Sequence, residues 1–400
     1  MTSAEISIAG ERGGADRRAP AVLQVLPALG AGGAERGAVD IAAALVESGW
    51  KAVVASSGGG LVRELERAGV RHVELPLASK NPLTILANAR ALEAIIVAER
   101  IDIVHARSRA PGWSAYLAAR RRKRFFVTTF HGAYDASNWL KRRYNGVMAR
   151  GDRIIAISQF IADHAIDTYG IGRNRVDVIE RGIDLERFNP DRVTPARMVQ
   201  LAHAWRLPDG MPVIMLPGRL ARLKGQSVLI DAVARLDRRD LRCLFIGEGH
   251  RGVRRRLESR IAALGIGDIC RFVDHCSDMP AAYMLADVVV SASTRPEGFG
   301  RIIAEGLAMG RPVIATDHGG AREILTSGEA GWLVPPGDPI ALAEALDEAL
   351  ALGPLQRIVR ANDAIDSIRA RFDKRRMAQQ TIELYERLLF PEPRADASTT

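Results

Sequence analysis

Residues 288–306, VVVSASTRPEGFGRIIAEG, join an apolar run to a helical pattern through a loop that contains glycines. The apolar residues at 287–291 predict a buried strand, and the spacing of apolar residues at 300–309 predicts an amphipathic helix. A buried strand that leads through a short loop into a helix is the repeating unit of a parallel α/β sheet. This stretch therefore predicts an α/β fold.

The same alternation runs along the rest of the chain and divides it into two halves. The first half has expected strands at 22–26, 52–55, 72–75, 103–105, 125–129, 153–157 and 176–179, and expected helices at 35–47, 83–99, 112–121 and 139–149. The second half has expected strands at 213–216, 242–246, 270–273, 287–291, 312–316 and 332–334, and expected helices at 226–236, 254–264, 300–309, 339–351, 355–371 and 374–389. Strands separated by helices imply parallel sheets covered on both faces. We expect two facing Rossmann-like domains, with ligands in a cleft at the carboxyl ends of the strands.

Breaks in this alternation suggest the domain boundaries. Residues 185–210 are rich in turn-forming residues, among them Asn189-Pro190, Pro195 and Leu207-Pro208-Asp209-Gly210. We expect an N-terminal domain, a C-terminal domain, a last helix that packs back toward the N-terminal domain, and two disordered ends. The N-terminal domain spans 20–195 and the C-terminal domain 196–372. The last helix lies at 373–390, and the disordered ends are 1–19 and 391–400.

The composition excludes several classes of protein. The 400 residues are 47% hydrophobic and 26% charged, which is typical of globular domains and not of collagen, disulfide scaffolds or disordered chains. The cysteines Cys243, Cys270 and Cys276 show no C-x-x-C spacing, which argues against a zinc site and favours a reducing compartment. The first 20 residues lack the apolar run of a signal peptide, and no stretch reaches the roughly 20 apolar residues of a membrane span. We expect a cytoplasmic protein.

A glycine-rich turn, Leu29-Gly30-Ala31-Gly32-Gly33-Ala34-Glu35, follows the first strand and opens a helix. Glycines let the backbone approach a phosphate, and the amino end of a helix offers free N–H groups. The turn is not a P-loop, because no Gly-Lys-Ser/Thr follows, and Glu35 stands where a dinucleotide fingerprint has its third glycine. Phosphate contact and a plain connection both remain open.

A second glycine motif, Gly247-Glu248-Gly249-His250-Arg251-Gly252, matches the dinucleotide pattern more closely. Asp274 follows at about the distance of a ribose-binding acid. The motif lies in the second unit of the second half, which weakens this interpretation. NAD binding, contact of Gly247 and Gly249 with another nucleotide, and a plain turn are the three alternatives.

Cations and an imidazole follow other predicted strands. The loop at 217–225, PGRLARLKG, places Gly218, Arg219 and Lys224 after a strand. The fork of an arginine and the point charge of a lysine suit a diphosphate, although a solvated basic loop has the same composition. His131 follows the strand at 125–129, either as a structural histidine or as part of the cleft wall.

Two carboxylates flank the amino end of the helix in the first stretch quoted. Glu297 precedes Gly300 and Arg301, and Glu305 lies one to two turns into the helix. An anion could bind the helix N–H groups while the carboxylates accept hydrogen bonds from sugar hydroxyls. The same pair fits the acid and base of a hydrolase, or an ordinary exposed helix start. Spacing alone does not separate these three interpretations.

The net charge of +9 comes from one segment. Residues 101–150 hold 11 Lys/Arg against 2 Asp/Glu, mixed with aromatic residues, while the rest of the chain is neutral overall. This pattern suits an anionic membrane surface, where each cation contributes about 1 kcal/mol; a solvated face is the alternative. No nucleic-acid motif accompanies the charge, so no nucleic-acid partner is expected. The candidate membrane-surface residues are Arg120, Arg121, Arg122, Lys123, Arg124, Lys141, Arg142 and Arg143.

Taken in order, these motifs resemble those of the family 4 glycosyltransferases, which are retaining enzymes with the GT-B architecture. The resemblance covers roughly residues 22–389, and the cell-envelope branch that makes lipopolysaccharide and related glycans is the nearest likeness. Arg181 departs from the family, which often has Asn there, and Gly306 stands where Ala is usual. The matched motifs are Gly32-Gly33-Ala34-Glu35, His131-Gly132, Arg181-Gly182-Ile183-Asp184, Gly218-Arg219, Lys224-Gly225, Glu297 with Glu305, the segment 310–315, Gly319-Gly320 and Glu323.

The resemblance implies a function. It implies a retaining glycosyltransferase that moves a sugar from a nucleotide diphosphate sugar to a lipid-linked or saccharide acceptor in cell-envelope glycan synthesis. It also implies that no metal or other cofactor is needed, and it fits a peripheral location on the cytoplasmic face of the inner membrane. A nucleotide-sugar epimerase of the same fold and a non-catalytic nucleotide-sugar-binding protein at the membrane are the alternatives.

The resemblance also implies roles for individual residues. Arg219 and Lys224 would neutralise the leaving diphosphate, Glu297 would hold hydroxyls of the transferred sugar, and His131 would lie near its reacting carbon. Preorganised cations stabilise the charge that develops as the glycosidic bond breaks. Donor binding would involve Gly33, Gly218, Gly247, Gly249, Phe299, Gly300, Arg301 and Glu305, of which the last would hold the ribose hydroxyls.

Overall fold

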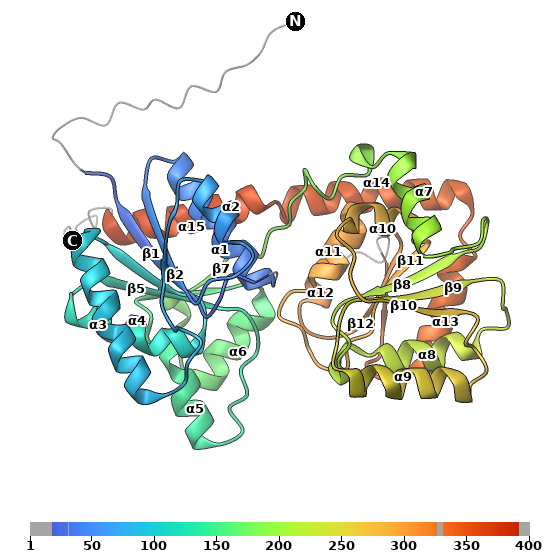
Figure 1. Cartoon of the computed structure of the whole chain (residues 1–400), viewed down its shortest axis with the longest axis horizontal. Coiled ribbons are helices and arrows are strands. Elements are labelled where there is room, and N and C mark those ends of the chain that lie inside the picture. Colours follow the sequence, from blue (N-terminus) through green and yellow to red (C-terminus); the bar gives the residue numbers. More distant parts are fainter. Residues whose placement is uncertain (1–17, 31, 326–330, 392–400) are drawn as a thin grey trace, which may run out of the picture.

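The structure is a computed structural model that describes residues 18–30, 32–325 and 331–391. Two α/β domains lie side by side, each with its own parallel sheet (Figure 1). The predicted architecture of two Rossmann-like domains is therefore confirmed. The predictions of disorder for residues 1–17 and 392–400 lie outside the described residues, as does Ala31 of the first glycine-rich turn.

Each domain has one sheet, and all neighbouring strands in both sheets are parallel. The N-terminal sheet has the order β3-β2-β1-β4-β5-β6-β7, with β1 (Ala21–Val25), β2 (Lys51–Ser56), β3 (Arg71–Glu74), β4 (Ile103–Ala106), β5 (Phe125–Phe130), β6 (Arg153–Ala156) and β7 (Val176–Val178). The C-terminal sheet has the order β10-β9-β8-β11-β12-β13, with β8 (Val213–Pro217), β9 (Arg242–Ile246), β10 (Cys270–Val273), β11 (Val288–Ser291), β12 (Val313–Thr316) and β13 (Gly331–Val334). In both sheets the order reverses beside the first strand, and the crevice at such a switch point is where ligands bind in open α/β sheets.

Helices connect the strands of both domains and extend beyond the last strand. The helices of the N-terminal domain are α1 (Gly33–Glu47), α2 (Val62–Arg67), α3 (Pro82–Ala98), α4 (Arg109–Arg121), α5 (Trp139–Asn145) and α6 (Gln159–Tyr169), with 3₁₀ helices η1 (Gly146–Arg150) and η2 (Arg173–Arg175). After the short η3 (Pro190–Arg192) come α7 (Pro195–Ala204), η4 (Arg222–Lys224), α8 (Gln226–Arg235), α9 (Arg251–Ala263), α10 (Met279–Leu285), α11 (Arg301–Ala308), α12 (Ala321–Ile324), α13 (Pro339–Leu350), α14 (Pro354–Arg371) and α15 (Lys374–Leu389).

Both faces of the central strands of each sheet are buried. On β1, Val22 packs with residues of α1 and α15, and Leu23, which points to the opposite face, packs with residues of α3 and α4. The C-terminal sheet alternates in the same way, with α8, α9 and α13 on one face and α10, α11 and α14 on the other. Sheets covered on both faces have strands that are apolar throughout, which is why the sequence shows the strands as short apolar runs.

Two crossings of the chain join the domains. Ile183 and Asp373 form a parallel bridge, in which the N–H of Ile183 donates to Phe372 O (2.8 Å) and the N–H of Lys374 donates to Ile183 O (3.0 Å). A Cβ at Gly182 would lie 2.3 Å from the Cα of Lys374, so only glycine allows this close approach. After the second crossing, α15 returns to the N-terminal domain and packs against α1, whereas α14 stays with the C-terminal domain (Figure 1).

The described helices include several that the sequence reading did not predict. Helix α7 begins at Pro195, inside the expected inter-domain break, because proline is favoured in the first turn of a helix. The single helix expected at 139–149 is two pieces, since α5 ends at Asn145 and a 3₁₀ turn continues from Gly146. Helices α2, α6, α10 and α12 were also not predicted.

Candidate functional site

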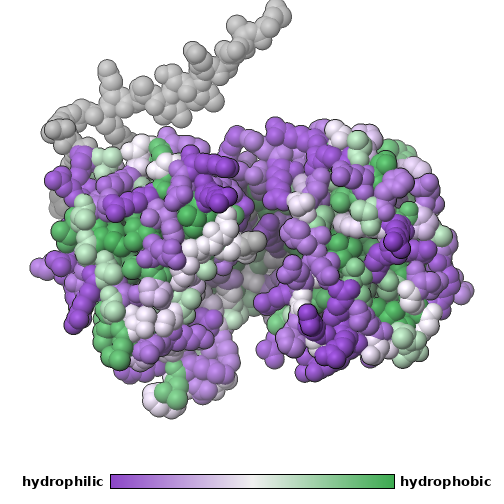
Figure 2. Space-filling view, viewed as in Figure 1, coloured by the Kyte–Doolittle hydropathy of each residue, from purple (hydrophilic) through white to green (hydrophobic). Residues whose placement is uncertain are grey.

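Two cavities meet at the carboxyl ends of the C-terminal strands. The larger, with a volume of about 990 Å³, lies on the loops that follow β8, β9 and β10, and its lining includes Gly218, Arg219, Gly247 and Gly249. The smaller, of about 260 Å³, lies between the domains and has Gly33 of α1 on one side. Arg301 and Glu305 of α11 line both cavities, and the molecular surface is hollowed between the domains (Figure 2). The structure thus brings together most of the predicted donor-binding residues.

Glu305 is a buried carboxylate that is held on both oxygens. Nε of Arg301 donates to Oε1 at 2.5 Å, and the Tyr283 hydroxyl donates to Oε2 at 2.9 Å. Burial and the adjacent carboxylate raise the pKa of Tyr283 well above its usual range, so this phenol remains a hydrogen-bond donor. Each oxygen keeps a second lone pair, with which it can accept a hydrogen bond from a sugar hydroxyl. Tyr283 was not among the predicted site residues, because its contact depends on packing between α10 and α11.

Lys224 and Glu297 form an ion pair. The Lys224 ammonium lies 2.8 Å from Glu297 Oε1, which also accepts a hydrogen bond from Ser293. Neither residue lines the two cavities described above, and both side chains are partly exposed. Gly319 and Gly320 fix the backbone of this loop: a Cβ on Gly319 would lie 2.5 Å from Glu297 O. The sequence placed Lys224 and Glu297 on two separate loops, after β8 and after β11, and did not predict that their charges pair.

The glycines after β8 and β9 are explained by the approach of two loops. Gly218 and Gly247 both have positive φ angles, +130° and +143°, which favour glycine. A Cβ on Gly247 would lie 2.5 Å from Gly218 O, and Gly249 pairs with Leu220 in an isolated bridge. Both loops border the larger cavity, where Arg219 is exposed. Asp274, the expected ribose acid of a dinucleotide site, is paired with Arg254.

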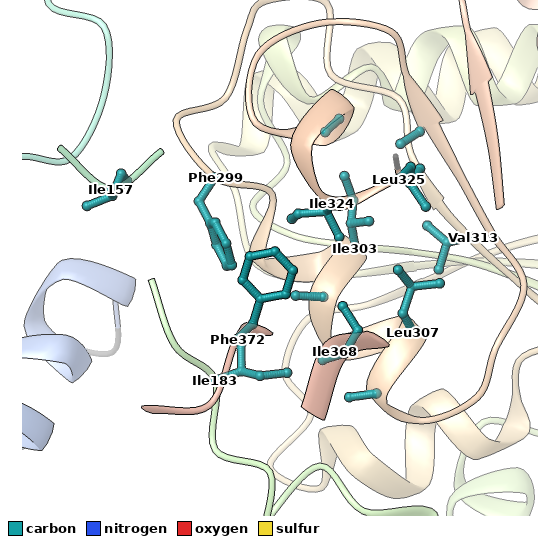
Figure 3. Close-up of a cluster of buried hydrophobic side chains, with 14 of the residues drawn as sticks. Ile157, Ile183, Phe299, Ile303, Leu307, Val313, Ile324, Leu325, Ile368 and Phe372 are labelled. Carbon is teal, nitrogen blue, oxygen red and sulfur yellow. The ribbon is translucent and has the colours of Figure 1, made fainter. Parts of the chain in front are cut away.

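Phe299 and Gly300 have different places in the structure. The Phe299 ring is buried and packs edge-on against Phe372 at 5.4 Å between centroids, within an apolar cluster near the chain crossing (Figure 3). Only its backbone is therefore available to a donor. Gly300 precedes α11 with a φ of +100°, and its own Cβ would lie 2.9 Å from Ile303. It starts the helix whose amino end faces the cavities.

The N-terminal domain contributes His131 and an arginine that was not predicted as a site residue. Nη2 of Arg181 lies 2.7 Å from Nδ1 of His131, and Nε2 of the same ring is buried with no partner in the described part of the chain. Burial and the neighbouring Arg181 and Arg107 hold the pKa of His131 well below its usual range. A Cβ on Gly33 would lie 2.8 Å from Nη1 of Arg181, so this glycine leaves room for the guanidinium.

Contacts across the cleft hold the two domains against each other. The N–H groups of Gln159 and Phe160, at the amino end of α6, donate to the carboxylate of Glu323 at 2.8 and 2.7 Å. The Ser158 hydroxyl donates to Gly298 O at 2.6 Å. A carboxylate of the C-terminal domain therefore caps a helix of the N-terminal domain, an arrangement that favours a negative charge at that end. Sequence reading matched Glu323 to the family but gave it no partner.

The structure divides the predicted basic surface into two groups at opposite ends of β5. Arg120, Arg121, Arg122, Lys123 and Arg124 precede this strand. Three of these arginines face carboxylates. Arg120 lies 4.0 Å from Asp152, and Arg121 and Arg122 lie 2.8 and 3.5 Å from Glu93. The other group follows the strand.

This second group lies on α5 beside exposed apolar side chains. Lys141 pairs with Asp135 at 2.7 Å, and no ion pair of Arg142 or Arg143 is found within the described residues. Trp139 and Leu140 are 71% and 60% exposed. A cavity of about 620 Å³ lies next to them and is lined by Lys80, Arg109, Leu140, Lys141 and Tyr144, among others.

Among residues 18–30, 32–325 and 331–391, no three His, Cys, Asp or Glu side chains are grouped so that they could hold a metal ion. None of the helices in the same residues combines the length and the apolar composition that crossing a membrane requires.

Comparisons with known proteins identify the family of the chain. Residues 31–187 match the protein family described as Glycosyltransferase Family 4, and residues 201–364 match the family described as Glycosyl transferases group 1. EpsD of Bacillus subtilis (strain 168), a glycosyltransferase by name, is 30% identical over 317 residues, which span 76% of this chain and 80% of that protein. A D-inositol 3-phosphate glycosyltransferase of Geodermatophilus obscurus is 30% identical over 354 residues, 80% of this chain and 75% of that one.

Solved structures extend the match to the whole fold. A glycosyltransferase from Rickettsia africae ESF-5 superposes with a TM-score of 0.87 and 36% identity, covering 94% of this chain and 100% of that chain. Anabaena HepE in complex with UDP-glucose has a TM-score of 0.80 and 23% identity, covering 92% and 99%, and thus shares the fold. The chain therefore belongs to the family 4 glycosyltransferases and has their GT-B fold.

Proposed function

We propose that this glycosyltransferase uses a nucleotide diphosphate sugar as its donor and transfers the sugar with retention of configuration. The observation that carries the proposal is the buried carboxylate of Glu305, which Arg301 and Tyr283 hold at the amino end of α11, beside the larger cavity. A carboxylate accepts hydrogen bonds from ribose hydroxyls, while the helix end and the arginine attract the diphosphate. The fold neighbour that binds UDP-glucose supports this assignment.

Cations from several loops would stabilise the departing diphosphate. Arg219 borders the donor cavity, Arg301 lies at the start of α11, and Lys224, which is paired with Glu297, follows Arg219 on the same loop. Preorganised cations in a cleft stabilise developing charge without reorganisation, which is usually the largest contribution to catalysis of this kind. We propose that these residues serve in place of a metal ion, and that the acceptor hydroxyl attacks from the face that the diphosphate leaves.

The acceptor is proposed to be a lipid-linked or saccharide intermediate of the cell envelope, reached at an anionic membrane on the cytoplasmic side. Trp139 and Leu140 project beside the cations of α5, and Leu83 at the start of α3 is 76% exposed. Apolar side chains with cations suit the headgroup region of a bilayer. Because three of the four arginines before β5 face carboxylates, we assign the membrane contact to the α5 group.

The donor is tested first, with a thermal-shift screen against UDP-, GDP- and ADP-sugars. A ligand at 100 times its Kd adds about 2.7 kcal/mol of stability, so the correct base is recognised by a clear rise in Tm. Incubation of that donor without acceptor then separates the alternatives, since an epimerase converts the sugar and a transferase leaves it largely intact. A protein that binds the donor but transfers nothing to any acceptor would be a non-catalytic binding protein.

Acceptors are compared as polyprenyl-phosphate-linked sugars, free saccharides and inositol 3-phosphate, the last because of the relative from Geodermatophilus. The anomeric configuration of the product is read by NMR, and inversion would refute the proposed stereochemistry.

K224A and E297A should abolish transfer while the circular dichroism spectrum is unchanged. R222A, which alters an exposed cation on the same loop, should retain transfer. Full activity of K224A and E297A would contradict the site assignment.

The membrane contact is tested by sedimentation with anionic vesicles. Binding should weaken as salt rises, because exposed charges are screened at about 10 Å in 0.1 M salt. The double variant W139S/L140S should reduce vesicle binding strongly. L355S, at an equally exposed apolar site on α14, serves as the control. Binding that ignores salt, or that L355S weakens equally, would contradict the proposal.

A further inference from the structure

The contact between Arg181 and His131 has a consequence for the proton on the imidazole. Nη2 of Arg181 lies 2.7 Å from Nδ1 of His131. A guanidinium has donors only, so Nδ1 must be the acceptor and carries no proton. In a neutral imidazole the proton is then on Nε2. Nε2 is the buried ring nitrogen that has no partner within the described residues. His131 therefore has one buried N–H that makes no hydrogen bond within the described residues.

Arg181 is well placed to hold this arrangement. It directly precedes Gly182 and Ile183, where the two chain crossings are hydrogen-bonded together, so its backbone is fixed. The missing Cβ of Gly33 leaves room for its guanidinium. Arg181 also lines the smaller cavity with Arg301, and within the described residues no carboxylate forms an ion pair with it. Its donors are therefore not engaged by a competing negative charge.

The charges around His131 favour the neutral ring. Arg181 and Arg107 are both cations, and His105 and Tyr134 are the other titratable groups near it. From the C-terminal domain, the backbone of Gly298 approaches, where a Cβ would lie 2.8 Å from His131 O. A proton added to Nδ1 would break the hydrogen bond and place a third positive charge beside two arginines. The surroundings thus oppose the imidazolium.

We propose that Arg181 is a positioning residue that keeps His131 neutral with its proton on Nε2, so that this N–H donates to an oxygen of the bound sugar donor. The proposal rests on the proposed function for the identity of that oxygen. It assigns a task to one of the two positions at which this chain departs from the family pattern. An asparagine there could donate or accept, and so would not determine which ring nitrogen is protonated.

The protonation state is measured directly by ¹⁵N NMR of the full-length protein labelled at histidine, with the His131 signals assigned by their loss in H131Q. In the wild type, Nδ1 should show the shift of an unprotonated nitrogen and Nε2 that of a protonated one, throughout the pH range in which an ordinary histidine titrates. R181N should lose this pattern and titrate nearer the ordinary value of about 6.5. R181K, which keeps a cationic donor, should partly restore it, and R187N, at another arginine of the smaller cavity, should leave it unchanged.

This readout does not depend on activity, so it separates the failure of this inference from the failure of the proposed function. If R181N leaves the tautomer and the titration of His131 as they are in the wild type, the inference is overturned, whether or not the protein transfers sugar. The same holds if His131 of the wild type carries its proton on Nδ1.

A double-mutant cycle tests whether Arg181 acts through His131. With the nucleotide sugar identified by thermal shift, R181N should lower kcat about 10- to 100-fold with little change in KM, less than the roughly 10²–10³-fold that removal of a transition-state donor costs. H131A combined with R181N should be no slower than H131A alone, because residues that act as one unit are not additive. Losses that multiply would show that Arg181 acts independently of His131, and would overturn the inference.

Discussion

Removal of one hydroxyl from α15 should destabilise the N-terminal domain measurably. The Tyr385 hydroxyl lies 2.6 Å from Nδ1 of His105, whose Nε2 lies 2.7 Å from the Thr129 hydroxyl, and all three side chains are buried. Y385F keeps the ring and its packing against Trp50 but leaves a buried imidazole nitrogen without a partner. An unsatisfied buried polar group costs about 1–3 kcal/mol.

The change in stability is measured by thermal unfolding of Y385F and of Y144F. For a unit of about 150–250 residues, 1 kcal/mol shifts Tm by roughly 2–4 °C, so Y385F should lower Tm by about 2–12 °C. The Tyr144 hydroxyl is buried without a partner in the described part of the chain, so Y144F deletes the same atom at little or no cost. Equal Tm values for the two variants would refute the claim that the His105 contact anchors α15.

Two further predictions concern the boundary between the domains. Burial raises the pKa of Asp40 to about 6, so this carboxyl costs stability above pH 6 and ceases to do so below about pH 4, where it is protonated in both the folded and unfolded states. D40N should therefore be more stable than the wild type at pH 7.5. Solvent screening of this partly exposed group reduces the free-energy cost of a pKa raised by about 2 units to about 1–2 kcal/mol. In urea unfolding, the difference in stability between D40N and the wild type should vanish near pH 4, and a difference that does not change with pH would contradict the prediction. G182A should destabilise the protein by about 1–3 kcal/mol, because its Cβ would lie 2.3 Å from the Cα of Lys374, whereas G146A, with open space around the added methyl and a helical backbone, should be neutral in the same unfolding assay.

The strands were predictable because burial on both faces leaves a signal in the sequence itself. Each predicted strand overlaps an observed one, as with 242–246, whose ends agree with those of the buried strand β9. Helices were missed where other features of the sequence obscured their periodicity. Helix α7 begins with a proline in a segment that is dense in turn residues, and α10 is only seven residues long. Short helices are determined by packing more than by periodicity.

The candidate site shows the same division at the level of single residues. Glycine motifs pointed to the loops after β8 and β9, because positive φ angles and close backbone approach demand glycine there. Tyr283 and Arg181 carried no such signal. Their contacts with Glu305 and His131 join residues 22 and 50 positions apart, and side-chain contacts of that kind depend on how elements pack.

The sequence by itself determined that two parallel α/β domains form, that chemistry-bearing residues follow their strands, and that the excess charge lies within residues 101–150. These properties are local: periodicity, turn chemistry and composition act within a few residues of one another. The tertiary structure decided which charges meet. It paired Lys224 with Glu297, placed Glu323 at the amino end of α6, set Arg181 against His131, and separated the basic residues before β5 from those on α5. Such pairings depend on distances between atoms that are remote along the chain; packing within each domain fixes most of these distances, and packing between the domains fixes the contact of Glu323 with α6.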